Sequence, residues 1–258
     1  LMFQPSEENG QGARAVVSDS RYKQIKPDLA FAIHIEPGRP FGYVSTRPGL
    51  INCASLGLKV TLNGKTAHAA DPSDGISPSL AVAEFIQKIS EFNHGDELNN
   101  NFRLTTVTHV QIGEQSFGIS PGDASIFVTL RTSNDDSLSQ LDKDVRGLVS
   151  NISTQFKLTF DFEIFDHFAA SINDKEAHDI AVNAMKSLNI NYGSIGVPMR
   201  ASEDFGIFGK QSRAAMLCLG PGEDYAALHN PDYDFNDDLI PIGTGIFERI
   251  TRDLLGTY

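Results

Sequence analysis

The chain has 258 residues, of which 40% are hydrophobic, and 33 acidic side chains against 21 Lys and Arg give it a formal net charge of −12. This length allows one large domain or two ordinary ones. No apolar run approaches the roughly 20 residues that a membrane span needs, and no cluster of Lys and Arg offers a face for phosphate groups. We therefore expect a soluble globular protein with no nucleic-acid partner and no membrane partner.

Two cysteines, Cys53 and Cys218, stand far apart and belong to no CxxC pair. We expect both to be core thiols in a reducing, cytoplasmic protein, and we recognise no signal peptide or lipidation motif. The chain does not begin with Met, and Leu1-Met2-Phe3 has the composition of the inside of a strand. This start predicts that the chain is a fragment or that a preceding segment was removed.

The middle of the chain predicts a complete small domain. Residues 55–63 alternate strictly between apolar and polar side chains, which is typical of a half-buried strand. Ser77-Pro78 predicts the start of a helix, with serine as N-cap and proline at the first helical position. The further elements expected are strands at 103–112, 123–131 and 157–165 and a helix at 137–155. The order βαββαβ predicts a ferredoxin-like domain inserted over residues 50–166.

The flanking segments have a different pattern. LMFQP, LAFAIHI and AAMLCLGPG are short, continuous apolar runs, which suit buried parallel strands. Helices are expected at about 174–188 and 243–256. The fold class predicted is therefore α/β, with one discontinuous α/β domain built from residues 1–49 and 167–258 around the insertion.

Several residues could take part in catalysis or metal binding, although each could also have a purely structural role. Glu7 and Glu8 either begin a helix, where acids are favoured, or bind a metal and move a proton. His34 ends the run LAFAIHI, and open α/β sheets present ligands at the carboxyl ends of strands. His229 lies in the acidic stretch LHNPDYDFND, which is either a solvated turn or a metal-binding loop. His68 lies among small residues in GKTAHAADP, and alone it is a weak signal.

Five motifs together resemble a known family. FQPSEENGQGA is similar to a FQPAEE-G-GA signature, AIHIEPGRPFGYV to an LHV-P-P-G segment, and GKTAHAADP to a G-GGHAA-P loop. RASEDFGIF is similar to GSEDF, and LCLGPGEDYAALHNPDYDFND to an LG…LHNP-YDFND ending. The chain thus resembles the dinuclear metal-dependent amidohydrolases of the aminoacylase–carboxypeptidase clan, in the branch of hippurate hydrolases, N-acetyldiaminopimelate deacetylases and auxin-conjugate hydrolases.

The resemblance implies roles for particular residues. Glu7 is then the general base and proton shuttle, Glu8 a ligand of one metal, and His34 and His229 ligands of the other. His68 reaches a neighbouring active site in a homodimer and stabilises the oxyanion. The implied cofactors are two divalent ions (Zn²⁺, Mn²⁺ or Co²⁺), and the implied architecture is a phosphorylase/hydrolase-like, aminopeptidase-type catalytic domain with a ferredoxin-like lid and dimerisation domain.

The sequence differs from the family in two places, and the family role of a third residue, Arg131, is assigned only weakly. The family has an upstream HACGHDGH-type segment that supplies further metal ligands, and this sequence does not contain it. Gly118 stands where the family has a lid asparagine, so a substrate or oxyanion contact is affected. Arg131 stands where the family has a lid arginine that contacts substrate. We therefore expect this chain alone to bind metal poorly and to be inactive.

The resulting functional expectation is metal-dependent hydrolysis of the amide bond of small N-acyl amino acids. A dipeptidase or carboxypeptidase of the same clan differs only in substrate. A non-catalytic homologue that dimerises and binds a ligand is the alternative of another class, and the residues encoded just before Leu1 would distinguish it from the hydrolase.

Overall fold

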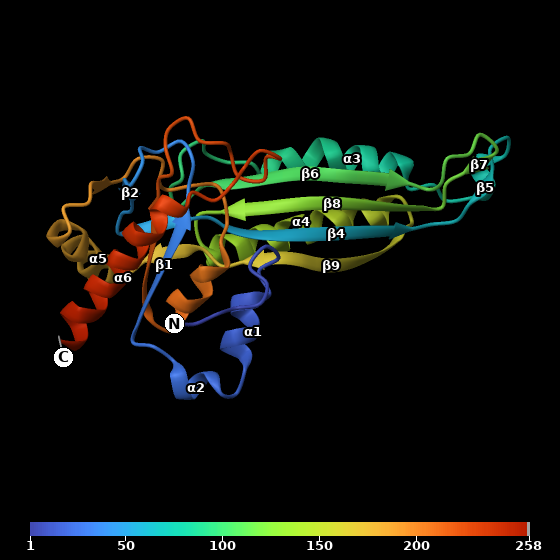
Figure 1. The fold of residues 1–258 in the computed structure, drawn as a ribbon. Coiled ribbons are helices and arrows are strands. Elements are labelled where there is room, and N and C mark those ends of the chain that lie inside the picture. The colour runs from blue at the N-terminus through green and yellow to red at the C-terminus, as the bar shows by residue number, and fades with distance from the viewer. Residues whose placement is uncertain (257–258) are drawn as a thin grey trace. The chain divides into compact units, whose positions relative to one another are not determined.

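The computed structural model describes residues 1–256 and divides into two compact units (Figure 1). The first unit is discontinuous and consists of Leu1–Glu7, Gln11–Cys53 and the chain from Ala169 onward. The second contains Glu8–Gly10 and Ala54–Phe168. The insertion expected over residues 50–166 therefore corresponds mainly to residues 54–168. Among the described residues, no helix combines the length and the apolar character needed to cross a bilayer.

The first unit is a mixed α/β structure. Its four-stranded sheet has the order β1-β12-β2-β11, in which β1 and β12 are parallel while β12 and β2 are antiparallel. A two-stranded ribbon pairs β10 with β3. The strands are β1 (Leu29–Ile35), β2 (Val44–Ser45), β3 (Gly49–Asn52), β10 (Ser171–Asn173), β11 (Tyr192–Gly193) and β12 (Arg213–Leu219). The helices are α1 (Gly12–Ser18), α2 (Tyr22–Ile25), α5 (Lys175–Ser187) and α6 (Ile240–Leu255), with 3₁₀ segments η3 (Asp204–Lys210) and η4 (Asp237–Leu239).

Strand β12 is apolar from Ala214 onward because both of its faces are covered there. Leu217 and Leu219 belong to a buried cluster that also contains side chains of α5 and α6. Met216 and Cys218 point to the other face, where they pack with Ile51 and Val197. A strand buried on both sides must carry a continuous apolar run, as β12 does. The prediction that LAFAIHI and AAMLCLGPG form parallel strands is confirmed. The expected burial of LAFAIHI was wrong, because β1 is the edge strand of the sheet and is only partly buried along its whole length.

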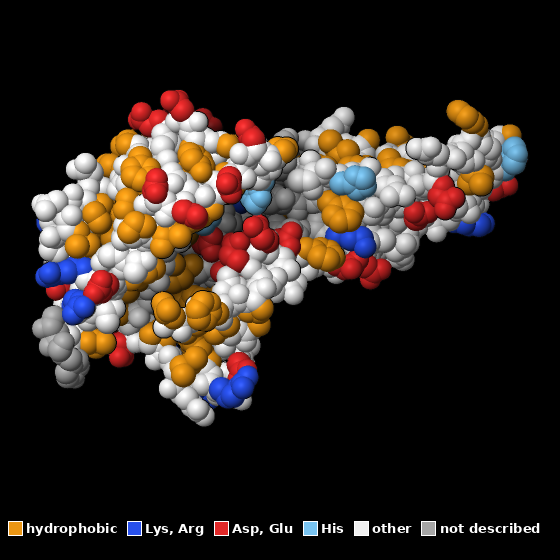
Figure 2. Space-filling view, viewed as in Figure 1, with side chains coloured by type: hydrophobic (Ala, Val, Ile, Leu, Met, Phe, Trp, Pro, Cys, Tyr) orange, Lys and Arg blue, Asp and Glu red, His pale blue; other side chains and the backbone are white. Residues whose placement is uncertain are grey.

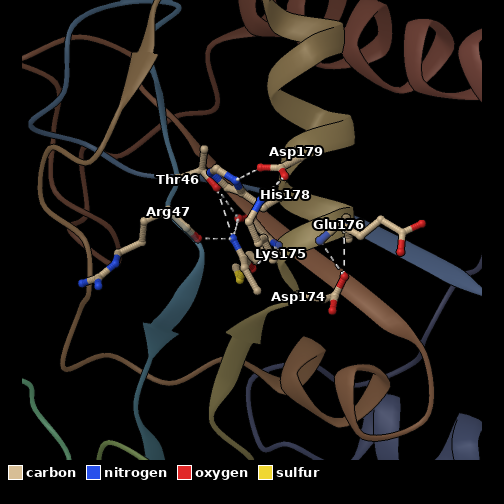
Figure 3. Close-up of polar contacts among 10 residues, drawn as sticks. Thr46, Arg47, Asp174, Lys175, Glu176, His178 and Asp179 are labelled. Carbon is tan, nitrogen blue, oxygen red and sulfur yellow. Dashed lines mark hydrogen bonds and ion pairs between the residues drawn. The ribbon is translucent and has the colours of Figure 1, made fainter.

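A buried asparagine, Asn173, ties three segments of this unit together. Figure 3 shows two of its partner residues, Thr46 and Arg47, and the following residue, Asp174. The side-chain amide of Asn173, at the end of β10, donates to Thr46 Oγ1 at 3.2 Å and to the carbonyl oxygens of Arg47 and Met216 at 3.0 Å each. Its carbonyl oxygen accepts from Met216 N at 2.7 Å. The next residue, Asp174, caps α5 by accepting from the backbone N–H groups of Glu176 and Ala177. The start of α5 is therefore fixed against β12.

The second unit contains a four-stranded antiparallel sheet in the order β6-β8-β4-β9 (Figure 1). Helices α3 and α4 contact each other and pack on this sheet. A separate two-stranded ribbon pairs β5 with β7. The strands are β4 (Ala54–Asn63), β5 (Ala67–His68), β6 (Arg103–Ile112), β7 (Ile119–Ser120), β8 (Asp123–Thr132) and β9 (Thr159–Phe168), and the helices are α3 (Ser79–Ile89) and α4 (Asp135–Gln155), with 3₁₀ segments η1 (Pro72–Asp74) and η2 (Ser90–Phe92).

The alternation in β4 has the expected structural cause. Leu56, Leu58, Val60 and Leu62 are buried, whereas the residues between them are partly exposed. Since successive side chains of a strand point to opposite faces, only one face of the sheet is covered by helices. The expected strands at 55–63, 103–112 and 123–131 and the helix at 137–155 are confirmed, with bounds shifted by at most two residues. The strand expected at 157–165 is also confirmed, as β9; it begins at Thr159 because Lys157 has a left-handed backbone (φ 57°) in the turn after α4.

Two local predictions were wrong. Leu1-Met2-Phe3 forms no strand, since no described strand pairs with it, and Leu1 and Phe3 are exposed. Helix α3 has Pro78 rather than Ser77 as its N-cap. Ser77 instead accepts a hydrogen bond from Ser79 N through its hydroxyl.

Candidate metal centre

Three carboxylates gather in the first unit. Glu7 lies in the turn before α1, and Glu203 and Asp204 lie at the start of η3. Each offers one oxygen atom, and these atoms lie within 4.8 Å of one another. It is the single such group of three or more His, Cys, Asp or Glu side chains in residues 1–256. Segments from opposite ends of the sequence therefore form one acidic site.

Hydrogen bonds hold Asp204 in this position. Its Oδ2 accepts from the backbone N–H of Ala13 in α1 at 2.8 Å, and its Oδ1 accepts from Gln4 Nε2 at 3.2 Å. Gly206 lets η3 approach the chain at Ala169 and Ala170, since a Cβ at Gly206 would lie 2.6–2.7 Å from their carbonyl oxygens. The SEDFG stretch therefore packs closely against both the N-terminal segment of the first unit and the chain at Ala169 and Ala170.

The carboxylates oppose each other's ionisation. Burial, followed by repulsion from Glu7 and Asp204, raises the pKa of Glu203 to about 8. Burial likewise raises the pKa of Asp204 to about 6, although the hydrogen bond from Ala13 N counteracts the rise. A bound cation would offset this repulsion. Clustered acids that resist ionisation are frequent at functional sites, so the cluster is a candidate site on physical grounds.

His34 lies next to this cluster. It is the sixth residue of β1, opposite Cys218 of β12. Its Nε2 lies 4.0 Å from Glu203 Oε2, and its Nδ1 lies 3.6 Å from Glu36 Oε2. Burial raises the pKa of the neighbouring Cys218 thiol to about 12, so this cysteine stays protonated. Carboxylate oxygen and imidazole nitrogen are the ligands that Zn²⁺, Mn²⁺ and Co²⁺ accept. Glu7, Glu203 and Asp204 can therefore hold a divalent cation, and His34, which is not part of this group, adjoins it through Glu203.

The other predicted ligands are placed differently. His229 belongs to the first unit and is exposed in a turn with φ 64°. Its ring is not part of the carboxylate group. Glu8 is exposed and belongs to the second unit. Their roles as ligands stay predictions.

The predicted lid residues all lie in the second unit. His68 in β5 pairs with Ile119 of β7, and Ala69 N donates to the carbonyl oxygen of Gly118 at 3.0 Å. The structure thus brings His68 and Gly118 together on one exposed ribbon. Arg131 lies near the C-terminal end of β8, opposite Ser55 of β4. The ribbon that carries His68 adjoins the N-terminal end of β8, whereas Arg131 lies near the C-terminal end of β8.

Sequence reasoning did not assign roles to Glu203, Asp204, Glu36 and Arg39. The stretch RASEDF was noted for its resemblance alone, although two adjacent acids in it repeat the pattern of Glu7 and Glu8. Glu36 and Arg39 follow the strand end that carries His34, where functional groups are expected. Their importance depends on burial and on contacts across the chain, which the sequence does not display.

Comparisons with known proteins show similarity along nearly the whole chain. The model of peptidase family M20/M25/M40 matches residues 1–253. The N-acetyldiaminopimelate deacetylase of Exiguobacterium sibiricum is 25% identical over 98% of this chain and 68% of its own length. The IAA-amino acid hydrolase ILR1-like 4 of Arabidopsis thaliana is 28% identical over 99% of this chain and 60% of its own length.

Solved structures share the fold. The dinuclear metal-binding M20-family peptidase YXEP of Bacillus subtilis aligns with a TM-score of 0.78 and 19% identity, over 99% of this chain and 65% of its own. The aminobenzoyl-glutamate utilization protein of Klebsiella pneumoniae aligns with a TM-score of 0.75 and 20% identity, over 97% of this chain and 60% of its own. The chain therefore spans about 60–68% of the length of these relatives.

Proposed function

Because the chain belongs to peptidase family M20/M25/M40, we propose that the gene product containing residues 1–258 hydrolyses the amide bond of N-acyl amino acids with the help of two divalent cations. The observation that carries this proposal is the buried group of Glu7, Glu203 and Asp204 beside His34. The curated relatives act on N-acetyldiaminopimelate and on IAA-amino acid conjugates, as their names state. Both substrates are small acylated amino acids.

The reaction needs a base, a cation site and an oxyanion donor. A bound divalent cation lowers the pKa of water toward neutrality and polarises the substrate carbonyl. Glu7 takes the proton of the attacking water and returns it to the leaving amine. Glu8, His34 and His229 serve as ligands, with Glu203 and Asp204 adding negative charge at the same place. His68 donates toward the oxyanion, and Arg131 and the region of Gly118 contact the substrate.

The proposal includes the second unit as a ferredoxin-like lid that forms a homodimer. Its strand order β6-β8-β4-β9 with two helices on one face supports this. Strand β6 lies at the edge of the sheet, and Leu80 and Ile86 of α3 are 70% and 43% exposed. Light scattering tests the dimer: Leu80→Glu with Ile86→Lys should yield monomers, whereas Leu254→Glu, an exposed position of α6, should not. A monomeric parent protein would overturn it.

Charge also favours a small, non-nucleic-acid substrate, and the two free, buried cysteines, Cys53 and Cys218, suit a protein of the reducing cytoplasm. The face shown in Figure 2 carries Lys and Arg as separate spots, with no continuous basic patch.

The test of the whole proposal is turnover. The complete gene product, loaded with Zn²⁺, Mn²⁺ or Co²⁺, should release amino acid from at least one of N-acetyl, N-benzoyl and indole-acetyl substrates. A dipeptide or C-terminal peptide cleaved in preference would instead identify a peptidase of the same clan.

A non-catalytic homologue is the second candidate. Residues 1–258 themselves contain no HACGHDGH-type segment, which would supply further ligands in the hydrolase. Residues 1–258 produced alone should therefore bind Zn²⁺ weakly and show no turnover. A gene that encodes no such segment, combined with ligand binding but no turnover, would support this candidate over the hydrolase.

A further inference from the structure

Glu36 lies two residues after His34, just past the end of β1, and faces the histidine ring from the side away from the carboxylate cluster. Glu36 Oε2 lies 3.6 Å from His34 Nδ1, whereas Glu203 Oε2 lies 4.0 Å from His34 Nε2. The two ring nitrogens therefore face different carboxylates. A neutral imidazole carries its proton on one nitrogen and its lone pair on the other, so the carboxylates compete for that proton.

The nitrogen that faces Glu36 lacks a partner. His34 Nδ1 is buried and has no hydrogen bond within the described part of the chain, although the side chain as a whole is 35% exposed. A buried donor without an acceptor is costly, by about 1–3 kcal/mol. Glu36 Oε2 is a carboxylate acceptor close to this atom, and a shift of about 0.5 Å would bring the pair into hydrogen-bond range.

Glu36 is itself held by a buried arginine. Arg39 is 5% exposed, and its Nη1 lies 3.5 Å from Glu36 Oε1. Arg39 Nε donates to Ser45 Oγ at 3.0 Å, and Arg39 Nη2 donates to the carbonyl oxygen of Gly196 at 3.1 Å. Gly196 allows this approach, because a Cβ there would lie 2.7 Å from Arg39 Nη2. The guanidinium is therefore a fixed group that keeps one oxygen of Glu36 away from the histidine and leaves the other facing it.

We propose that Glu36, anchored by Arg39, is the positioning residue of His34: it accepts a hydrogen bond from Nδ1–H and thereby presents the Nε2 lone pair to a divalent cation at the Glu7, Glu203 and Asp204 cluster. This inference rests on the proposed function. A histidine that binds metal commonly donates its other ring N–H to a carboxylate, which fixes the tautomer and the ring orientation. Here the carboxylate comes from the same strand end, and Glu36 acts through His34.

The first experiment reads the tautomer directly in the metal-free gene product. Long-range ¹H–¹⁵N spectra of protein labelled in histidine, assigned with His34→Gln, should show His34 with its proton on Nδ1. Glu36→Ala should shift His34 toward the Nε2–H tautomer, which predominates in isolated imidazoles without a directing acceptor. Glu36→Gln keeps an accepting oxygen and should retain the Nδ1–H form. Glu223→Gln removes an exposed acid of the same unit and should match the parent.

The second experiment measures affinity for Zn²⁺ by chelator competition. Losing such an outer partner typically costs 10- to 100-fold in metal affinity, so Glu36→Ala should bind Zn²⁺ 10- to 100-fold more weakly. Glu36→Gln should recover part of that loss, and Glu223→Gln should lose none. An unchanged tautomer in Glu36→Ala, or Zn²⁺ affinity within threefold of the parent, would overturn the inference while leaving the hydrolase proposal intact. A parent protein that binds no divalent cation would overturn both the proposed function and Glu36's role in presenting Nε2, whatever the tautomer.

Discussion

The carboxyl groups of Glu203 and Glu7, which lie far apart in the sequence, belong to one group of three acids whose oxygen atoms lie within 4.8 Å of one another. Burial and the repulsion from Glu7 and Asp204 raise the pKa of Glu203 to about 8. Glu203 is the more buried of the two. Without a bound cation, Glu203 therefore keeps its proton at neutral pH. A bound metal ion would instead balance the negative charge of the three acids.

The first prediction concerns stability against pH in the presence of EDTA. The folded-state pKa of Glu203 is about 8 against an ordinary value of 4.5, so the folded state binds more protons than the unfolded state between these values. The free energy of unfolding therefore falls as the pH rises through this window, by about 2–4 kcal/mol. Asp204 adds to the fall between 3.8 and about 6.

Urea denaturation at pH 5 and pH 9 measures this effect, with Glu203→Gln as the test variant. The amide can still donate to Glu7 but does not ionise, so the variant should lose much less stability between the two pH values. Glu223→Gln, an exposed acid, serves as the control and should follow the parent. A parent protein equally stable at pH 5 and 9 in EDTA would contradict the prediction.

The second prediction concerns Asn173, whose side chain makes four hydrogen bonds to the chain around β2 and β12. Asn173→Ala leaves Met216 N and two carbonyl oxygens buried without this partner, which should lower the free energy of unfolding by about 2–4 kcal/mol. Asn183→Ala, on the exposed side of α5, should change it by less than about 0.5 kcal/mol. Equal effects of the two variants in urea denaturation would show that the buried network contributes nothing.

The sequence predicted those features of the fold that depend on periodic side chains. The buried faces of β4, β8 and α4 follow from alternation or from spacings of three and four, because one face of each packs on the core. It also predicted the parallel pairing of β1 and β12, but only β12 is buried, because β1 is the edge strand of its sheet and stays partly exposed. It failed at Leu1-Met2-Phe3, because an apolar run forms a strand only where another strand offers hydrogen-bond partners.

The candidate site could be predicted only in part. Glu7 and His34 were identified by their positions at the ends of apolar segments. Glu203 and Asp204 were not, because their significance comes from burial against Ala13 and Glu7, which are remote in sequence. Glu36 and Arg39 have the appearance of an ordinary charged turn in EPGRP. Only the structure shows that the arginine is buried and directs the carboxylate toward His34.

The third prediction uses two glycines of the same 3₁₀ segment. A Cβ at Gly206 would lie 2.6 Å from the Ala169 carbonyl oxygen, which is backbone and cannot move aside cheaply. A Cβ at Gly209 would meet its nearest neighbour at an ordinary 3.7 Å. Gly206→Ala should therefore destabilise the protein by about 1–3 kcal/mol, whereas Gly209→Ala should be close to neutral. Thermal unfolding of both variants in EDTA checks the difference, and equal melting temperatures would refute the close fit of η3.

The last prediction separates proton transfer from metal binding at Glu7. Glu7→Gln keeps the size and an accepting oxygen of the side chain but removes the base. In the complete gene product it should lower kcat for the best N-acyl amino acid by about 100- to 10,000-fold, as expected for loss of a general base. KM and the bound metal, measured by atomic emission on the same sample, should change little if Glu8 and the histidines hold the cations. Loss of metal together with activity would instead make Glu7 a ligand, in keeping with its place among the oxygens of Glu203 and Asp204. Full activity with metal retained would remove Glu7 from the mechanism.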